Sequence, residues 1–112
     1  MSERRRWKRF LLCFKGHPTF HCVLQIAEGV TVNASLQDIS CGGIRLEVNK
    51  DDDLPQLLEG QGVEFLDFDA PRFEFLKGKR GIVTWYRPHE RQFGASFMEI
   101  LRKGQVEDLL KA

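Results

Sequence analysis

The feature of this sequence that most restricts its fold is the two-residue alternation of apolar and polar side chains in short successive segments. Residues 20–26 and 30–36 alternate in this way, and Glu28-Gly29 between them is typical of a tight turn. Residues 44–48 alternate again. Because successive side chains on a strand point to opposite faces, the pattern predicts three strands, each with one buried face.

The rest of the chain continues in short apolar segments. Residues 63–68, 73–76, 81–86 and 93–97 are predicted strands, and the polar stretch 49–61 is a connection. After Ile100, the spacing of Leu101, Val106, Leu109 and Leu110 favours a short amphipathic helix. We therefore expect a mainly β protein: a six- or seven-stranded antiparallel β-barrel, closed or nearly closed, with a short C-terminal α-helix. The pattern leaves the strand order open.

The basic charge is concentrated at the N-terminus. Residues 1–10 carry four arginines and Lys8 against Glu3, a net charge of +4, so the remaining residues sum to −3 in a chain of net charge +1. We predict a basic arm over residues 1–15 and a barrel with its helix over residues 16–112, a single domain overall. The arm is where an anion would bind.

Nothing in the sequence indicates export. The apolar run 10–14 is too short for a signal peptide, and no stretch approaches the length of a membrane span. The three cysteines (Cys13, Cys22 and Cys41) include no C-x-x-C pair, so no disulfide framework is implied. We expect a cytoplasmic protein.

The turn at Glu28-Gly29 has a geometric consequence. If it closes a two-residue hairpin, Phe20 faces Gln37 and Thr19 faces Asp38. The alternation breaks at residues 38–43, which predicts a loop or bulge there. Arg9 lies ten residues before Thr19, within reach of that loop. We therefore predict that the basic arm and the Asp38 segment converge at one end of the barrel.

The converging segments resemble a known family. Arg5-x-x-x-Arg9, followed after the hairpin by Asp38-x-Ser40-x-x-Gly43, is similar to the paired signature of PilZ domains, which are bacterial receptors for cyclic di-GMP. The surroundings of Gly43 and the segments 81–85 and 93–97 fit the same family. The resemblance implies a cyclic di-GMP receptor or adaptor that passes its signal to a partner protein, as the chain shows no second domain for an output.

The resemblance also implies roles for individual residues. Arg5 and Arg9 would contact guanine and phosphate, and Asp38, Ser40 and Gly43 would contact the second guanine. The residue types suit this ligand, because a guanidinium can bind phosphate oxygens or the edge of guanine with two hydrogen bonds and can stack on a purine. In an extended arm Arg5 and Arg9 lie roughly 13 Å apart, enough to bracket a dinucleotide.

Two further residues complete the predicted site. A basic residue directly before the arginine pair, here Arg4, accompanies capture of two intercalated ligand molecules in this family, because a further guanidinium offsets the repulsion of four phosphates. Trp85 is a candidate for stacking on the ligand, although an aromatic residue in this position also suits the barrel core or its surface. We expect no other ligand or cofactor.

Other functions receive less support from the residues. A barrel that binds single-stranded nucleic acid through residues 4–10 is the main alternative, but the acidic remainder of the chain disfavours it. A PilZ fold that serves only as a protein-interaction module is a second alternative. The positions of Cys13, His17, His21 and Cys22 do not have the spacing of a zinc site. No catalytic motif is present, so we expect no enzyme and no metal.

Overall fold

The structure is a computed structural model that describes residues 9–12 and 19–109. Seven antiparallel strands, two 3-10 turns and one helix follow one another along this part of the chain. They are β1 (Phe10–Leu11), β2 (His21–Ala27), β3 (Val30–Ile39), β4 (Gly43–Val48), β5 (Gly62–Phe68), η1 (Pro71–Leu76), β6 (Arg80–Arg87), η2 (Pro88–Glu90), β7 (Gln92–Phe97) and α1 (Lys103–Leu109).

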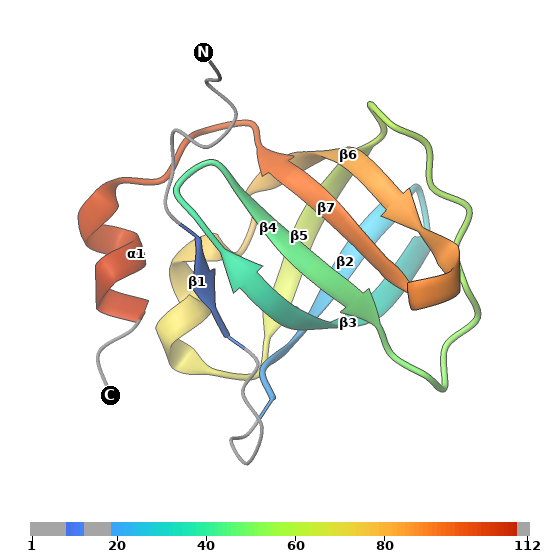
Figure 1. The fold of residues 1–112 in the computed structure, drawn as a ribbon, viewed down its shortest axis with the longest axis horizontal. Helices are drawn as coiled ribbons and strands as arrows, with labels where there is room; N and C mark the ends of the chain where they lie inside the picture. The colour runs from blue at the N-terminus through green and yellow to red at the C-terminus, as the bar shows by residue number, and fades with distance from the viewer. Residues whose placement is uncertain (1–8, 13–18, 110–112) are drawn as a thin grey trace.

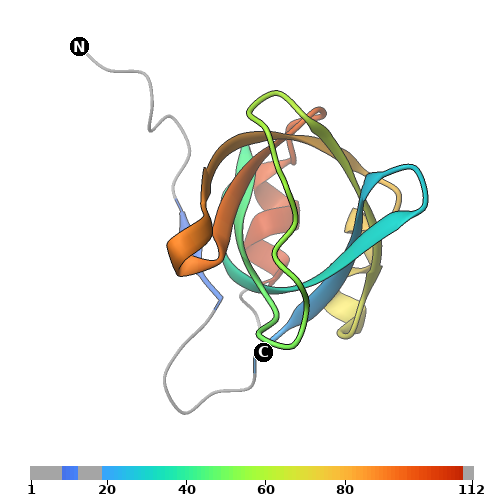
Figure 2. The ribbon, with the colours of Figure 1, turned by 90° about the vertical axis from the view of Figure 1, so that its right-hand side faces the viewer.

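Six of the strands form a closed barrel. The strand order is β1-β3-β2-β5-β6-β7-β4, and pairing of β4 with β3 closes the ring, so β1 remains outside it as an added strand on β3. Figure 2 views the ring end-on: the connection between β4 and β5 crosses one opening, and α1 lies at the other end. The predicted six- or seven-stranded antiparallel barrel with a C-terminal helix is confirmed.

The core lies inside the barrel and consists of the apolar half of each alternating pattern. Leu24, Leu36, Leu46, Phe65 and Phe93 are fully buried there. His21 is exposed while Cys22 is buried, as the alternation predicts for neighbours on a strand. Burial raises the pKa of the Cys22 thiol to about 12, so this cysteine is a protonated core residue at neutral pH.

One predicted strand is wrong. Residues 73–76 belong to the 3-10 turn η1, not to a strand. Phe73 and Leu76 are both fully buried. Side chains three residues apart lie above one another on a 3-10 helix, so one turn buries both of them. Pro71 begins the turn, where its missing N–H costs nothing.

The predicted hairpin register holds only next to the turn. Ala27 pairs with Val30 as expected, and Gly29 has a left-handed φ of 72°. A bulge between Gln25 and Ala27 then shifts the register by one residue, so that the N–H of Leu36 donates to the carbonyl of Phe20. The position opposite Asp38 is occupied by Leu11 of β1 and not by Thr19.

The segment around Asp38 is a strand end and not a loop. Strand β3 continues to Ile39, and only residues 40–42 form the tight connection to β4. Leu36 and Ile39 are both fully buried although they are three residues apart. The pairing of β3 with β4 is irregular between Leu36 and Asp38, which turns Asp38 to the outer surface of the barrel. The predicted break in the alternation is this bulge.

Candidate functional site

The candidate site is built on a lateral row of paired residues across the outer surface of the barrel. Leu11 of β1 pairs with Asp38 of β3, Asp38 with Arg45 of β4, Arg45 with Gly94 of β7, and Gly94 with Trp85 of β6. Opposed residues on adjacent antiparallel strands have neighbouring side chains. The row therefore assembles an acid, an arginine and an aromatic ring from segments far apart in the sequence.

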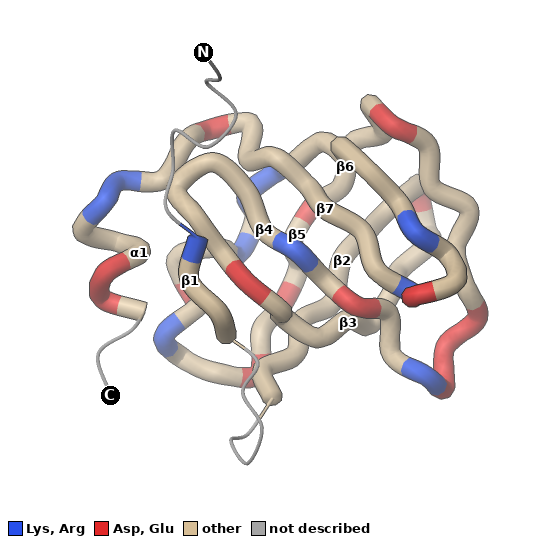
Figure 3. The backbone as a smooth tube through the Cα atoms, in the orientation of Figure 1, with Lys and Arg blue, Asp and Glu red and all other residues tan. Residues whose placement is uncertain are grey.

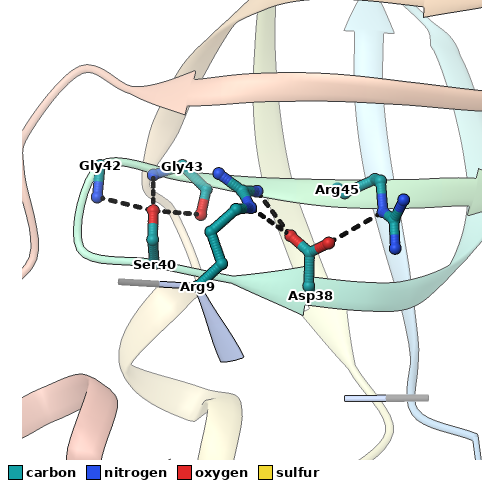
Figure 4. A network of polar contacts seen from close by, with 6 residues as sticks. All are labelled: Arg9, Asp38, Ser40, Gly42, Gly43 and Arg45. Carbon is teal, nitrogen blue, oxygen red and sulfur yellow. Dashed lines mark hydrogen bonds and ion pairs between the residues drawn. The ribbon is translucent and has the colours of Figure 1, made fainter. Parts of the chain in front are cut away.

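Asp38 is a buried carboxylate held between two arginines (Figure 4). Its Oδ1 accepts a hydrogen bond from Arg9 Nε at 2.7 Å and lies 2.5 Å from Arg9 Nη2. Its Oδ2 lies 2.9 Å from Arg45 Nε. This second contact is an ion pair without hydrogen-bond geometry, since the buried Nε of Arg45 makes no hydrogen bond. One carboxylate between two guanidinium groups leaves an excess positive charge, which favours an anion.

Ser40 and Gly43 form the connection between β3 and β4 (Figure 4). The buried Ser40 Oγ accepts hydrogen bonds from the backbone N–H groups of Gly42 and Gly43, each at 3.2 Å. The Ser40 N–H donates to the Gly43 carbonyl at 2.8 Å. A Cβ on Gly43 would lie 2.7 Å from the carbonyl oxygen of Ala95. In the structure both residues keep the loop narrow and close to β7.

Trp85 lies across β7 beside this loop. A Cβ on Gly94 would lie 2.2 Å from the indole Nε1, so the ring occupies the space that any side chain at position 94 would need. The Arg87 guanidinium lies over the same ring, 4.8 Å from its centroid. Trp85 is half-buried. It is therefore a surface aromatic held in place by a glycine and an arginine, and not a core residue.

These groups line a single groove of about 900 Å³. Arg9, Asp38, Ser40, Gly43, Arg45 and Trp85 are among its lining residues. This volume is at the upper end of the usual range for small-molecule sites. Another hollow, of about 700 Å³, lies between β3 and the connection to β5, but it is lined by three consecutive aspartates, Asp51–Asp53. Their carboxylates would repel an anion, so the groove at Asp38 is the better anion site.

The predicted convergence of the arm and the Asp38 segment is present for the described part of the arm, since Arg9 contacts Asp38. Arg9, Asp38, Ser40, Gly43 and Trp85 all line the groove. Arg4 and Arg5 lie outside the described residues. Whether any of these residues contacts a ligand stays a prediction at this point.

Sequence reasoning missed Arg45, Arg87 and Gly94. A signal for Arg45 was available, because it is the outward residue between buried Ile44 and Leu46, two positions after Gly43 of the predicted motif. The approach of Trp85 to Gly94 had no local signal, since it depends on the register of β6 with β7.

Comparison with known proteins identifies the family. The family model for the PilZ domain matches residues 3–112. The chain belongs to the PilZ domain family. No curated protein matches this PilZ domain. The predicted resemblance to the PilZ family is thus confirmed over nearly the whole chain.

Two solved structures share the fold. The PilZ domain with c-di-GMP of YcgR from Escherichia coli matches with a TM-score of 0.66 and 16% identity, over 96% of this chain and 89% of that one. The inhibitor of motility MotI/DgrA of Bacillus subtilis matches with a TM-score of 0.58 and 16% identity, over 93% of this chain. This PilZ domain spans only 47% of that protein, about half its length.

Within residues 9–12 and 19–109, no group of three or more His, Cys, Asp or Glu side chains is placed to hold a metal ion. In the same part of the PilZ domain, no helix has both the length and the apolar character needed to cross a bilayer. Cys13 and His17 lie outside the described residues.

Proposed function

We propose that this PilZ domain is a cyclic di-GMP receptor and that the ligand binds in the groove between the arginine arm and the Asp38–Gly43 segment. The observation that carries the proposal is the contact of Arg9 with Asp38, which joins both halves of the family signature in one groove beside Trp85. In support, a PilZ domain of similar fold from E. coli is described with c-di-GMP.

The groups in the groove suit the chemistry of this ligand. Arg9 brings a guanidinium group that can bind phosphate oxygens with two hydrogen bonds. Trp85 offers an aromatic surface on which a guanine can stack. Gly43 keeps the loop backbone close to β7 at the groove, and Arg5 would reach the groove from the arm.

The test is calorimetry with cyclic di-GMP on the full chain. We expect saturable binding, and Arg5→Ala or Arg9→Ala should each weaken it about a hundredfold, because each removes charge-assisted hydrogen bonds worth about 2–3 kcal/mol. A short oligonucleotide serves as the control ligand. Affinity that survives both substitutions would contradict the assignment. Binding of the oligonucleotide alone would favour a single-stranded nucleic-acid barrel, and binding of neither would favour a protein-interaction module.

The same titration gives the stoichiometry. We propose two ligand molecules per chain, because Arg4 adds a guanidinium directly before the Arg5 and Arg9 pair and offsets the repulsion between four phosphates. Arg4→Leu should then lower the stoichiometry toward one ligand per chain. A wild-type titration that saturates at one ligand per chain would remove Arg4 from this role.

We further propose that the bound state is read by a partner protein at the arm. Leu11 is half-exposed and directly follows Arg9 and Phe10. A backbone shift at Arg9 would therefore displace Leu11, an apolar surface residue two positions away. A partner that binds the arm would therefore distinguish the ligand-free state from the ligand-bound state.

Interleaved charges over the barrel support the nucleotide proposal over the nucleic-acid alternative. Figure 3 shows basic and acidic residues interspersed along the described strands, with no continuous basic track. A groove that follows a nucleic-acid backbone carries positive charge over several strands. A compact anion that binds one row of residues needs no such track.

A further inference from the structure

Asp38 is shared between two arginines that differ in how firmly they are held. Arg45 belongs to β4, which pairs along its length with β3 on one side and β7 on the other. Arg9 precedes β1, a strand of two residues that pairs only with β3. The two side chains are similarly exposed, at 40% for Arg9 and 34% for Arg45, whereas Asp38 is only 8% exposed. Arg45 is therefore fixed by its strand, and Arg9 is the one that can move.

The two arginines also use different oxygens of the carboxylate. Arg9 contacts Oδ1 through two nitrogens, and Arg45 contacts Oδ2 through Nε. Departure of Arg9 therefore leaves Oδ2 paired. Without Arg45, the same departure would leave a buried carboxylate with no positive partner among the described residues. Leaving one member of a buried pair uncompensated is strongly unfavourable.

We propose that Arg45 is the fixed counter-ion of Asp38, a positioning residue that permits Arg9 to pass from Asp38 to a phosphate of an anionic ligand. An arginine whose only partner is a buried carboxylate is held tightly and binds a phosphate poorly. Arg45 weakens that hold because it already neutralises part of the carboxylate charge. The ligand half of this inference rests on the proposed function, whereas the charge arrangement can be tested without ligand.

The first test is a double-mutant cycle in chemical denaturation of the full chain. Arg9→Gln alone should change the unfolding equilibrium constant by less than about threefold, because Arg45 remains on Asp38. In the Arg45→Gln background, the same change should destabilise the fold at least about tenfold, because Asp38 loses its last partner. In the Asp38→Asn background, the coupling should vanish. The matched control is Arg80→Gln, which removes an exposed arginine on β6. This substitution should not couple to Arg9.

Additive effects of the Arg9 and Arg45 substitutions would overturn the proposal. So would coupling that persists in the Asp38→Asn background, because it would then not pass through the carboxylate. This cycle needs no ligand, so its outcome is separate from that of the proposed function. If wild-type protein does not bind cyclic di-GMP, the proposed function fails and the cycle still decides the role of Arg45.

The second test is a titration with cyclic di-GMP. Arg45→Gln should weaken binding about tenfold although Arg9 and Asp38 are intact, and Arg45→Lys should restore most of the affinity by keeping the charge. In the Asp38→Asn background, where Arg9 is already free, Arg45→Gln should cost nothing further. An equal loss in both backgrounds would show that Arg45 contacts the ligand itself and would overturn the counter-ion role. If Asp38→Asn binds too weakly to titrate, the denaturation cycle alone decides.

Discussion

At the scale of single residues, Gly43 and Gly94 are both required for space, but different neighbours occupy that space. A Cβ on Gly43 would meet the backbone oxygen of Ala95 at 2.7 Å, and a Cβ on Gly94 would meet the Trp85 side chain at 2.2 Å. A backbone atom within a paired sheet cannot move without breaking the pairing, whereas an indole can rotate away. Substitution of Gly43 should therefore affect mainly the stability of the fold, and substitution of Gly94 mainly ligand binding.

We expect Gly43→Ala to destabilise the fold by about 1–3 kcal/mol, because β4 must move away from β7. Gly94→Ala should change stability less but displace Trp85, weakening cyclic di-GMP binding about tenfold through lost stacking. Denaturation and calorimetry measure the two effects. In a Trp7→Phe background, the fluorescence of Trp85 should also shift to the red in Gly94→Ala as the indole enters water. Unchanged emission and affinity would show that Trp85 does not depend on Gly94.

At the scale of elements, the 3-10 turn η1 stands between β5 and β6, where a strand was predicted, and contributes side chains to the core. Phe73 is fully buried, stacks with Phe68 at 5.8 Å between ring centroids, and meets the edge of the Phe20 ring at 5.1 Å. Arg72 of the same turn lies over Phe20 and donates to the carbonyl of Leu109 at 3.2 Å. The turn thus joins the start of β2, the end of β5 and helix α1.

Phe73→Ala should therefore cost about 3–5 kcal/mol of stability, the usual range for a buried phenylalanine. Phe75→Ala, in the same turn but only half-buried, is the matched control and should cost clearly less. Urea or guanidinium denaturation monitored by circular dichroism gives both values. Equal losses of stability in the two variants would contradict the placement of Phe73, and not Phe75, in the core.

At the scale of the whole molecule, the proposed site spans one side of the barrel and leaves the other side uninvolved. The lateral row crosses β1, β3, β4, β7 and β6, whereas β2 and β5 lie outside it. Since the row is held by strand pairing, the groove is largely preformed. Among the described strands, β1 is held by the least pairing, because it has two residues and pairs with β3 alone (Figure 1).

Hydrogen exchange should therefore change unevenly when cyclic di-GMP is added. We expect altered protection at residues 9–12, where Arg9 leaves Asp38, and increased protection at residues 40–45 beside the ligand. Strand β5 should remain unchanged, since it contributes no residue to the groove. Unchanged exchange at residues 9–12 under saturation would contradict the proposal that a partner reads the arm.

Much of the site could be predicted because its parts are local. The alternation fixed which side chains face the core, since that depends only on the direction of successive residues on a strand. The paired Arg and Asp-x-Ser-x-x-Gly segments were recognisable for the same reason, as each lies within six residues. The strand predicted over residues 73–76 is wrong because Phe73 and Phe75, two residues apart, fit one face of a strand, whereas the buried pair is Phe73 and Leu76, three residues apart, as in a 3-10 turn.

What the tertiary structure alone decided is the register of strands distant in the sequence. The bulge before Ala27 and the irregularity near Asp38 shift pairing by one residue, and a shift of one residue exchanges the faces of a strand. These shifts place Leu11 rather than Thr19 opposite Asp38, and closure of the barrel places Arg45 and Trp85 on either side of Gly94. Such pairings cannot be predicted from local sequence, because their stability comes from packing and hydrogen bonds between strands.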